Sequence, residues 1–248
     1  MAYVIEWVGT GSGLNPALGN TSFIVRAEGN RALLVDCGAT VPLALMKEKR
    51  LAEITDVLIT HAHADHIGGL EGFGFMHYFA LKRRGETRPN LHVANDGFAR
   101  DLWEGSLKGG MTKALNDDNE PFDATLDTYF NVHTSEKITI PGLPTIEFFP
   151  TLHVMGLENY GVQFADGVFY SGDTVQPPKH DAKVIFQDCQ FYKTKSDVHI
   201  PYEDLKALPT SVKAKTHLVH LGGGYDKIDC KADGFAGFVM PGDIFTFE

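Results

Sequence analysis

The chain has 248 residues, of which 43% are hydrophobic, so it can bury a substantial core as one large domain or two small ones. Its 22 Lys and Arg residues against 32 Asp and Glu residues give a formal charge of −10. This charge opposes any function that depends on non-specific attraction to a long polyphosphate backbone, although a bound metal ion could still attract a small anion.

The cysteines and the N-terminus indicate a reducing cellular compartment. Cys37, Cys189 and Cys230 are too few and too scattered for a disulfide framework. The opening residues, MAYVIEWVGTGSG, lack a basic region followed by a long apolar run, and the sequence has no window of about 18 uncharged apolar residues. We therefore expect a cytoplasmic protein with no membrane partner, located in the host cytoplasm if the gene belongs to a phage.

Short β-like runs occur in the first part of the chain, at residues 3–9, 21–38 and 56–60. The middle run reads as a hairpin that turns at residues 28–30. Helical spacing follows at 41–54 and 98–107, with a short β run at 91–96 between them. Residues 108–136 are less regular, and we interpret them as a solvated surface loop, with a lid or a subunit contact as the alternative.

The second half repeats this order of elements. Runs at 145–153, 161–174 and 182–189 correspond to those at 3–9, 21–38 and 56–60. Two similar halves that face each other predict an α/β fold, an αββα sandwich in which residues 1–248 form a single domain with one shared core.

A cluster of metal-type side chains follows the β run at 56–60, in ITHAHADHIGG. Imidazoles and a carboxylate are the ligands expected for Zn²⁺ and similar ions. Strand alternation would direct His61 and His63 to one side, and a loop turn would bring Asp65 and His66 around a second position. Four ligands cannot all serve one tetrahedral ion that also keeps an open position, so we expect two metals.

Three further residues complete this set. His153, Asp173 and His220 each lie at the end of a predicted strand, where open sandwich folds gather their sites. Each would be weak evidence alone, because isolated histidines are usually core or surface residues. Together with the cluster they make seven candidate ligands. Asp36 is the first-half counterpart of Asp173, and we expect it to form structural hydrogen bonds near the site.

The ordered motifs HAHADH, His153, SGDT and His220 resemble those of the metallo-β-lactamase superfamily. The resemblance implies that His61, His63 and His153 bind one divalent metal and that Asp65, His66 and His220 bind the other. Asp173 would bridge the two ions, which would be Zn²⁺, with Mn²⁺ as the alternative. The true β-lactamases place a cysteine near the bridging position, so Asp173 speaks against that activity.

Within this superfamily, GTGSGLNP, VDCGAT, QDC and DVHIPYEDL resemble the ribonuclease Z branch of phosphodiesterases. The resemblance implies that His199 donates a proton to the leaving group, that Asp188 orients it, and that Asp65 belongs to the catalytic set. As the alternative, His199 is an ordinary residue at the start of a helix.

The chain departs from ribonuclease Z because it lacks the long basic arm that grips transfer RNA. Only nineteen residues separate His153 from Asp173. Compact members without this arm act on small cyclic phosphodiesters, and the chain is similar in layout to phage-encoded anti-Pycsar enzymes, which destroy cyclic mononucleotide signals. The resemblance therefore implies a small anionic cyclic nucleotide as substrate and no long nucleic acid as partner.

An aromatic stretch at residues 69–85 follows the metal motif. Such rings are more often core residues than pocket residues. As alternatives, Phe73, Phe75, His77 and Tyr78 stack on a base or pack across a homodimer interface. We expect Lys82, Arg83 and Arg84 to form a solvated face.

The predicted function is metal-assisted hydrolysis of a cyclic nucleotide to a linear monophosphate. Bound ions make this reaction possible because they lower the pKa of the attacking water. Two alternatives remain at this point. One is another hydrolase of the same fold, such as a thioesterase or a lactonase, which would not need His199. The other is a protein that sequesters a nucleotide without cleaving it.

Overall fold

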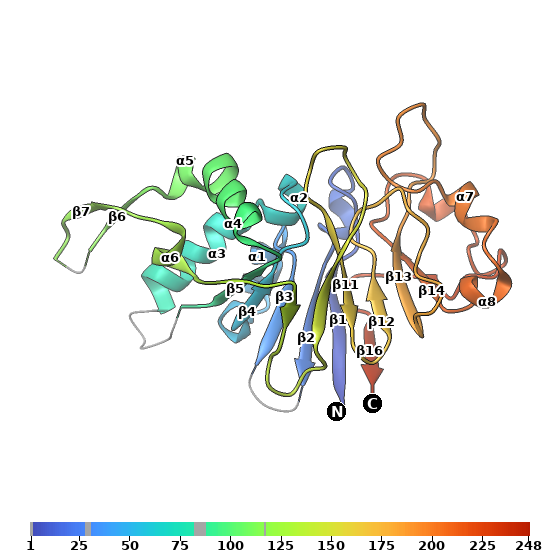
Figure 1. Cartoon of the computed structure of the whole chain (residues 1–248), viewed down its shortest axis with the longest axis horizontal. Helices are drawn as coiled ribbons and strands as arrows, with labels where there is room; N and C mark the ends of the chain where they lie inside the picture. The colour runs from blue at the N-terminus through green and yellow to red at the C-terminus, as the bar shows by residue number, and fades with distance from the viewer. Residues whose placement is uncertain (1, 28–30, 82–87, 117) are drawn as a thin grey trace.

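The computed structural model describes residues 2–27, 31–81, 88–116 and 118–248 (Figure 1). The expected turn at 28–30 and the basic residues Lys82, Arg83 and Arg84 lie outside the described residues. In the described part of the chain, two seven-stranded sheets and a separate two-stranded hairpin account for the β-structure. No helix there is long and apolar enough to cross a membrane.

The first sheet has the strand order β16-β1-β2-β3-β4-β5-β8, and the second has the order β15-β14-β13-β12-β11-β10-β9. The strands of the first sheet are β1 (Tyr3–Gly9), β2 (Ser22–Ala27), β3 (Ala32–Val35), β4 (Asp56–Leu58), β5 (Asn90–Val93), β8 (Asn131–Thr134) and β16 (Ile244–Phe247). Those of the second are β9 (Lys137–Ile138), β10 (Ile146–Pro150), β11 (Tyr160–Phe164), β12 (Val168–Tyr170), β13 (Val184–Asp188), β14 (Thr216–Val219) and β15 (Gly237–Phe238).

The two sheets repeat one pairing pattern. Strands β1, β2 and β3 pair antiparallel, and β3, β4, β5 and β8 continue in parallel. Strands β10, β11 and β12 pair antiparallel, and β13, β14 and β15 follow in parallel. This correspondence confirms the predicted internal repeat. Because parallel strands end at the same edge, each sheet brings the residues after β3 and β4, or after β12 and β13, close together.

Helices lie on the outer faces of both sheets (Figure 1). The α-helices are α1 (Val41–Lys47), α2 (Ala64–Ile67), α3 (Leu70–Phe75), α4 (Asp96–Leu102), α5 (Lys108–Met111), α6 (Leu126–Tyr129), α7 (Tyr202–Lys206) and α8 (Thr210–Lys213). Short 3₁₀ and π segments are η1 (Pro16–Leu18), η2 (Leu51–Glu53), η3 (Met76–Leu81), η5 (Trp103–Leu107) and η6 (Tyr225–Lys227). Local sequence explains several starts: Pro42 stands in the first turn of α1, and the Asn95 side chain accepts a hydrogen bond from Phe98 N at the start of α4.

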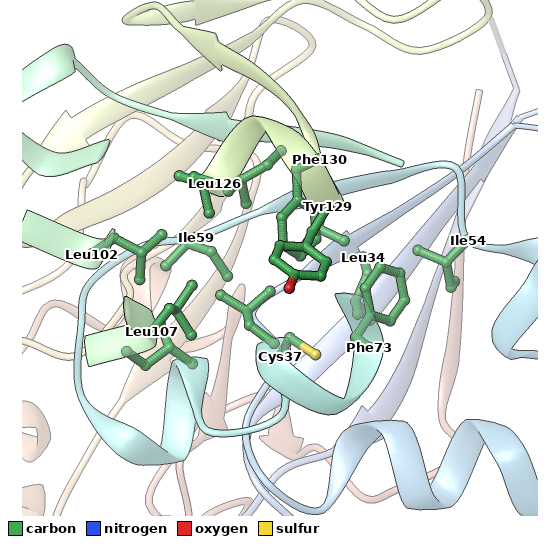
Figure 2. Packing of buried hydrophobic residues seen from close by; sticks show 14 of the residues in the cluster. Leu34, Cys37, Ile54, Ile59, Phe73, Leu102, Leu107, Leu126, Tyr129 and Phe130 are labelled. Carbon is green, nitrogen blue, oxygen red and sulfur yellow. The ribbon is translucent and has the colours of Figure 1, made fainter. Parts of the chain in front are cut away.

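The apolar core has one layer between the sheets and another beneath the helices of the first half. Alternate residues of β1, namely Tyr3, Ile5 and Trp7, are buried in the layer between the sheets, as expected for a strand with one inward face. Figure 2 shows the other layer, where Phe73 and Tyr129 pack near Leu34. These layers confirm the predicted αββα arrangement.

Residues 108–136 differ from the expected solvated loop. They contain α5, a hairpin of β6 (Lys113–Leu115) and β7 (Pro121–Asp123), α6, and the edge strand β8. Met111, Tyr129 and Phe130 are fully buried. The loop interpretation was wrong because these apolar residues are dispersed among polar ones, although residues 118–120 at the hairpin turn are exposed as expected. The hairpin itself extends away from the body of the protein (Figure 1).

The aromatic stretch after the metal motif belongs mainly to the core. Phe73 is fully buried and the His77 side chain nearly so, hence neither ring can stack on a base or on a second subunit. Phe75 and Tyr78 are partly buried, and their ring centroids lie 5.6 Å and 5.4 Å from that of Tyr129. The interpretation of these rings as core residues is the one that fits Phe73 and His77.

Candidate metal centre

The HAHADH motif begins just after β4 and continues into helix α2. His61 pairs with Asn159 through an isolated β-bridge, His63 is the N-cap of α2, and Asp65 and His66 lie within the helix. Strand alternation therefore does not explain why His61 and His63 meet. Their rings converge, with centroids 4.8 Å apart, because the chain turns from the bridge into the helix between them.

A first group of side chains is formed by His61, His63, His153 and Asp173. The Nδ1 atom of His63 lies 3.2 Å from His61 Nε2 and 3.1 Å from His153 Nε2. Asp173 Oδ2 lies 3.8 Å from His61 Nε2 and 3.9 Å from His153 Nε2. One ligand atom from each of the four lies within 4.8 Å of the others, which is a spacing that could hold a metal ion.

A second group consists of Asp65, His66, His220 and again Asp173. The Nε2 atoms of His66 and His220 each lie 3.4 Å from Asp173 Oδ2, and His220 Nε2 lies 3.3 Å from Asp65 Oδ2. Asp173 thus stands between the two groups, with the same carboxylate oxygen facing both. The structure brings all seven sequence-predicted ligands into this one centre.

Three imidazoles of this centre are held from outside through their Nδ1 atoms. His66 Nδ1 lies 2.8 Å from Asp36 Oδ2, His153 Nδ1 lies 2.6 Å from the carbonyl oxygen of Val198, and His61 Nδ1 lies 3.1 Å from Thr60 Oγ1. Such partners fix ring orientation and tautomer, and metal-ligating histidines almost always have them.

Two buried atoms in the centre have no hydrogen-bond partner among the described residues. They are His66 Nε2 and Asp173 Oδ1. An unpaired buried polar atom is costly unless something else satisfies it. A pair of divalent cations fits this donor set of five imidazoles and two carboxylates, because it would engage these orphaned atoms as well as the others.

Burial and charge act in opposite directions on the pKa values. Burial lowers the pKa of His61 and His153, which favours the neutral imidazole that can bind a metal. Burial also acts to lower the pKa of His220, but Asp173, Asp188 and Asp65 outweigh it and raise that pKa to about 10. A cation bound beside His220 would take the place of this proton, so metal binding should release protons.

Asp36 has the structural role expected from the sequence. Its carboxylate is fully buried and accepts hydrogen bonds from Thr60 N at 2.8 Å and from Thr60 Oγ1, as well as contacting His66. The residue has a φ of 61°, a conformation that aspartate tolerates better than most residues. Asp36 therefore connects the loop after β4 with an imidazole of the second group.

His199 and Asp188 form a dyad beside the centre. His199 Nδ1 lies 2.8 Å from Asp188 Oδ2, which also accepts a hydrogen bond from Thr174 N at 2.9 Å. Burial acts to lower the pKa of His199, but the Asp188 carboxylate outweighs it and raises the pKa. The other oxygen, Asp188 Oδ1, lies 3.2 Å from His220 Nδ1. One carboxylate thus orients both His199 and a residue of the second group.

The centre is the floor of a cavity of about 410 Å³. The residues of its walls were not among those predicted from the sequence. Ser12, Gly13 and Leu14 come from the loop after β1, and Gln190, Tyr192 and Val198 come from the segment between β13 and α7. The glycine-rich GTGSG run was the available signal, because glycine permits close approach of the backbone. A Cβ atom on Gly13 would lie only 2.9 Å from Asp65 Oδ2.

Comparison with known proteins identifies the family. Residues 3–245 match the family described as "Anti-Pycsar protein Apyc1". The chain belongs to this family. A relative from Paenibacillus harenae, named anti-Pycsar protein Apyc1, is 35% identical over 235 residues, which cover 90% of this chain and 91% of the relative. One with the same name from Bacillus phage BSP38 is 34% identical over 240 residues and 88% of each chain.

A solved structure shows the same fold. The metallo-β-lactamase fold protein YhfI from Bacillus subtilis superposes with a TM-score of 0.73 over the full length of both chains, at 18% identity. At this identity the similarity establishes the fold alone. The predicted metallo-β-lactamase fold is thus confirmed, and so is the resemblance to the anti-Pycsar family.

Proposed function

We propose that the protein is a metal-dependent phosphodiesterase that hydrolyses small cyclic nucleotides to linear monophosphates and thereby disables a cyclic-nucleotide defence against phage. Membership of the anti-Pycsar family supports the substrate class. The single observation that carries the chemistry is the pair of ligand groups that share Asp173, with the His199–Asp188 dyad beside them. We place its activity in the cytoplasm, the host's if a phage carries the gene, and propose that residues 1–248 form a single domain.

We propose that His61, His63 and His153 hold one divalent ion, that Asp65, His66 and His220 hold the other, and that Asp173 contacts both. An imidazole-rich set favours Zn²⁺, with Mn²⁺ as the alternative. When bound, the ions would lower the pKa of the attacking water and offset the charge on the phosphate oxygens. None of the described residues that line the cavity is Lys or Arg, so no side chain there offers this positive charge permanently.

The remaining steps use the protein's own residues. His199 donates a proton to the departing sugar oxygen, and Asp188 keeps the ring oriented and favours its protonated form. Asp65, whose carboxylate is 20% exposed and lines the cavity, orients the attacking water. A donor such as His199 and an acceptor such as Asp65 lower the barrier because they are already positioned before the reaction begins.

The metal stoichiometry can be tested directly by elemental analysis of the purified protein. We expect two divalent ions per chain at saturation. Asp173→Ala should deplete both positions, because Asp173 Oδ2 faces both groups, whereas His153→Ala should mainly weaken the first. One ion per wild-type chain at saturation would contradict the proposal.

The reaction itself is tested by anion-exchange analysis of products from a panel of cyclic nucleotides. We expect His199→Ala to retain both metals and to lower turnover of cyclic nucleotides by roughly 10²- to 10⁴-fold, because an alkoxide leaving group needs a proton. The loss on bis(p-nitrophenyl) phosphate should be much smaller, because its phenolate leaves without help. Equal losses on both substrates would show that His199 positions substrate or supports a metal. No loss on either would show that hydrolysis does not use His199. If the wild-type protein turned over no cyclic nucleotide, a thioesterase, a lactonase or a nucleotide-sequestering protein would be favoured.

We also propose that the protein is a homodimer. The β6–β7 hairpin extends away from the body and carries Leu115, which is 46% exposed (Figure 1). A two-fold axis that places this hairpin or the partly buried Phe75 and Tyr78 against the other subunit would cover these apolar groups. Light scattering should report about twice the chain mass of 27.3 kDa, and the monomer mass at micromolar concentration would exclude the dimer.

A further inference from the structure

The cavity changes character from floor to mouth. Its floor consists of the imidazoles and carboxylates of the metal centre, whereas its mouth carries Leu14, Tyr192 and Val198. These three side chains are exposed by 95%, 59% and 37%, respectively. Exposed apolar groups that gather at the mouth of a polar pocket are typical of a ligand site, because scattered ones would need no explanation.

The segment that carries Tyr192 is held in place from two sides. The preceding residue, Phe191, is partly buried and packs against the core of the second half, with its ring centroid 5.7 Å from those of Tyr202 and Phe238. The Tyr192 side chain, by contrast, lies at the cavity mouth. The partly buried Phe191 anchors the backbone at Tyr192 before a ligand arrives, which lowers the entropy cost of binding.

A carboxylate closes the same loop. Asp197 Oδ1 accepts hydrogen bonds from Gln190 Nε2 at 2.6 Å and from Thr194 N and Oγ1, both at 2.7 Å. Lys193 Nζ contacts Asp204 Oδ1 at 2.8 Å and so ties the loop to α7. The Gln190 amide nitrogen uses one of its two hydrogens in this bond, which connects the side chain of Gln190 to the loop.

We propose that Tyr192, together with Leu14 and Val198, forms the subsite that binds the face of the nucleobase of the cyclic nucleotide. This inference rests on the proposed function. With the cyclic phosphate at the floor, the base on the opposite side of the sugar must lie toward the mouth, where these apolar groups are. A flat heterocycle gains from stacking on an aromatic ring, and this contact requires no hydrogen-bond partner.

The apolar patch of Leu14, Tyr192 and Val198 is too small to be a binding surface for a macromolecule. Specific protein interfaces bury about 800 Å² on each partner, far more than three side chains provide. A single base covers an area of the size that these side chains offer, and it is brought there by its attachment to the reacting phosphate.

The test compares wild type, Tyr192→Ala and Tyr192→Phe in steady-state kinetics on cyclic nucleotides and on ribose 3′,5′-cyclic phosphate, which has no base. We expect Tyr192→Ala to raise KM for the cyclic nucleotides by roughly 5- to 50-fold, with kcat within about twofold, because stacking is lost. Tyr192→Phe should behave as wild type, and KM for the base-free substrate should not change in either variant. Met155→Ala is the matched control, because Met155 is 91% exposed but does not line the cavity.

Two results separate the failure of this inference from that of the proposed function. An unchanged KM for cyclic nucleotides in Tyr192→Ala, or an equal rise for the base-free substrate, would overturn the base subsite while wild-type hydrolysis still supports the function. Wild-type protein that neither hydrolyses any cyclic nucleotide nor binds one in equilibrium dialysis would overturn both.

Discussion

Gly13→Ala is expected to weaken one metal position without removing any ligand. A Cβ atom on residue 13 would lie 2.9 Å from Asp65 Oδ2, 3.0 Å from its Cγ and 3.3 Å from its Cβ. Side-chain Cβ atoms essentially never approach another atom to less than 3.0 Å, so either the loop or the carboxylate must move. The glycine is therefore required by the position of Asp65.

The loop is the harder of the two to displace. Ser12 N and Asn15 Nδ2 both donate to the carbonyl oxygen of Leu221, at 3.3 Å and 2.8 Å, and Leu221 N donates to Thr10 O at 2.7 Å. These bonds attach the loop directly to the residue after His220. We therefore expect the Asp65 carboxylate to move by several tenths of an ångström, away from its present 3.3 Å distance to His220 Nε2.

The expected cost follows from this displacement. Insertion of one carbon into a packed site costs about 1–3 kcal/mol. Changes that disturb a ligand without deleting it lower metal affinity by roughly 10- to 100-fold. Because the displaced residue belongs to the second group, we expect only the ion that we propose for Asp65, His66 and His220 to be affected.

The measurement is metal content after dialysis against increasing concentrations of a chelator, followed by native mass spectrometry. Gly13→Ala should lose one ion at roughly 10- to 100-fold lower chelator concentration than wild type, and the second ion as wild type does. Gly223→Ala is the control, because a Cβ atom there would meet nothing within 4 Å. If Gly13→Ala held both ions as firmly as wild type, the proposed assignment of Asp65 as a ligand would be wrong.

Three further outcomes are expected. Asp36→Ala should lower the free energy of unfolding, measured in urea, by about 3 kcal/mol or more, because it leaves buried donors on Thr60 and His66 unpaired. Asp36→Asn should cost less, and a loss under about 1 kcal/mol for Asp36→Ala would contradict this reasoning. Burial lowers the pKa of His77 to about 4, so the folded state resists protonation and its stability falls by roughly 3 kcal/mol in all as pH drops from about 6.5 to about 4. Urea unfolding at pH 7 and pH 4.5 should show that His77→Phe lacks this part of the fall, and an equal fall in stability for the two proteins would refute it. Removal of metal with a chelator should abolish hydrolysis and lower Tm, because bound ions would stabilise only the folded state. Added Zn²⁺ should restore both, and an unchanged Tm would count against a metal in this centre.

The sequence alone was sufficient to predict the repeated order of elements and to name the seven residues that meet in the centre. Two-residue periodicity reveals strands with one buried face, such as β1, and its recurrence in β10 indicated two similar halves. The HAHADH cluster is a local signal, because four metal-type side chains lie within six positions. His153, Asp173 and His220 are weak evidence singly, and they were recognisable because they follow the cluster in the order of a known set of motifs.

Only the tertiary structure decided how these residues meet and what surrounds them. His61 and His63 converge through a bridge to Asn159 and the start of α2, and not through strand alternation. The segment 108–136 supplies an edge strand, which its polar composition concealed. Likewise, the contact between Asp65 and His220 joins residues 155 positions apart. Such contacts depend on how two sheets pack face to face, and packing across sheets has no periodic signature in the sequence, so the supporting residues Asp36 and Gly13 acquire their partners only in the folded chain.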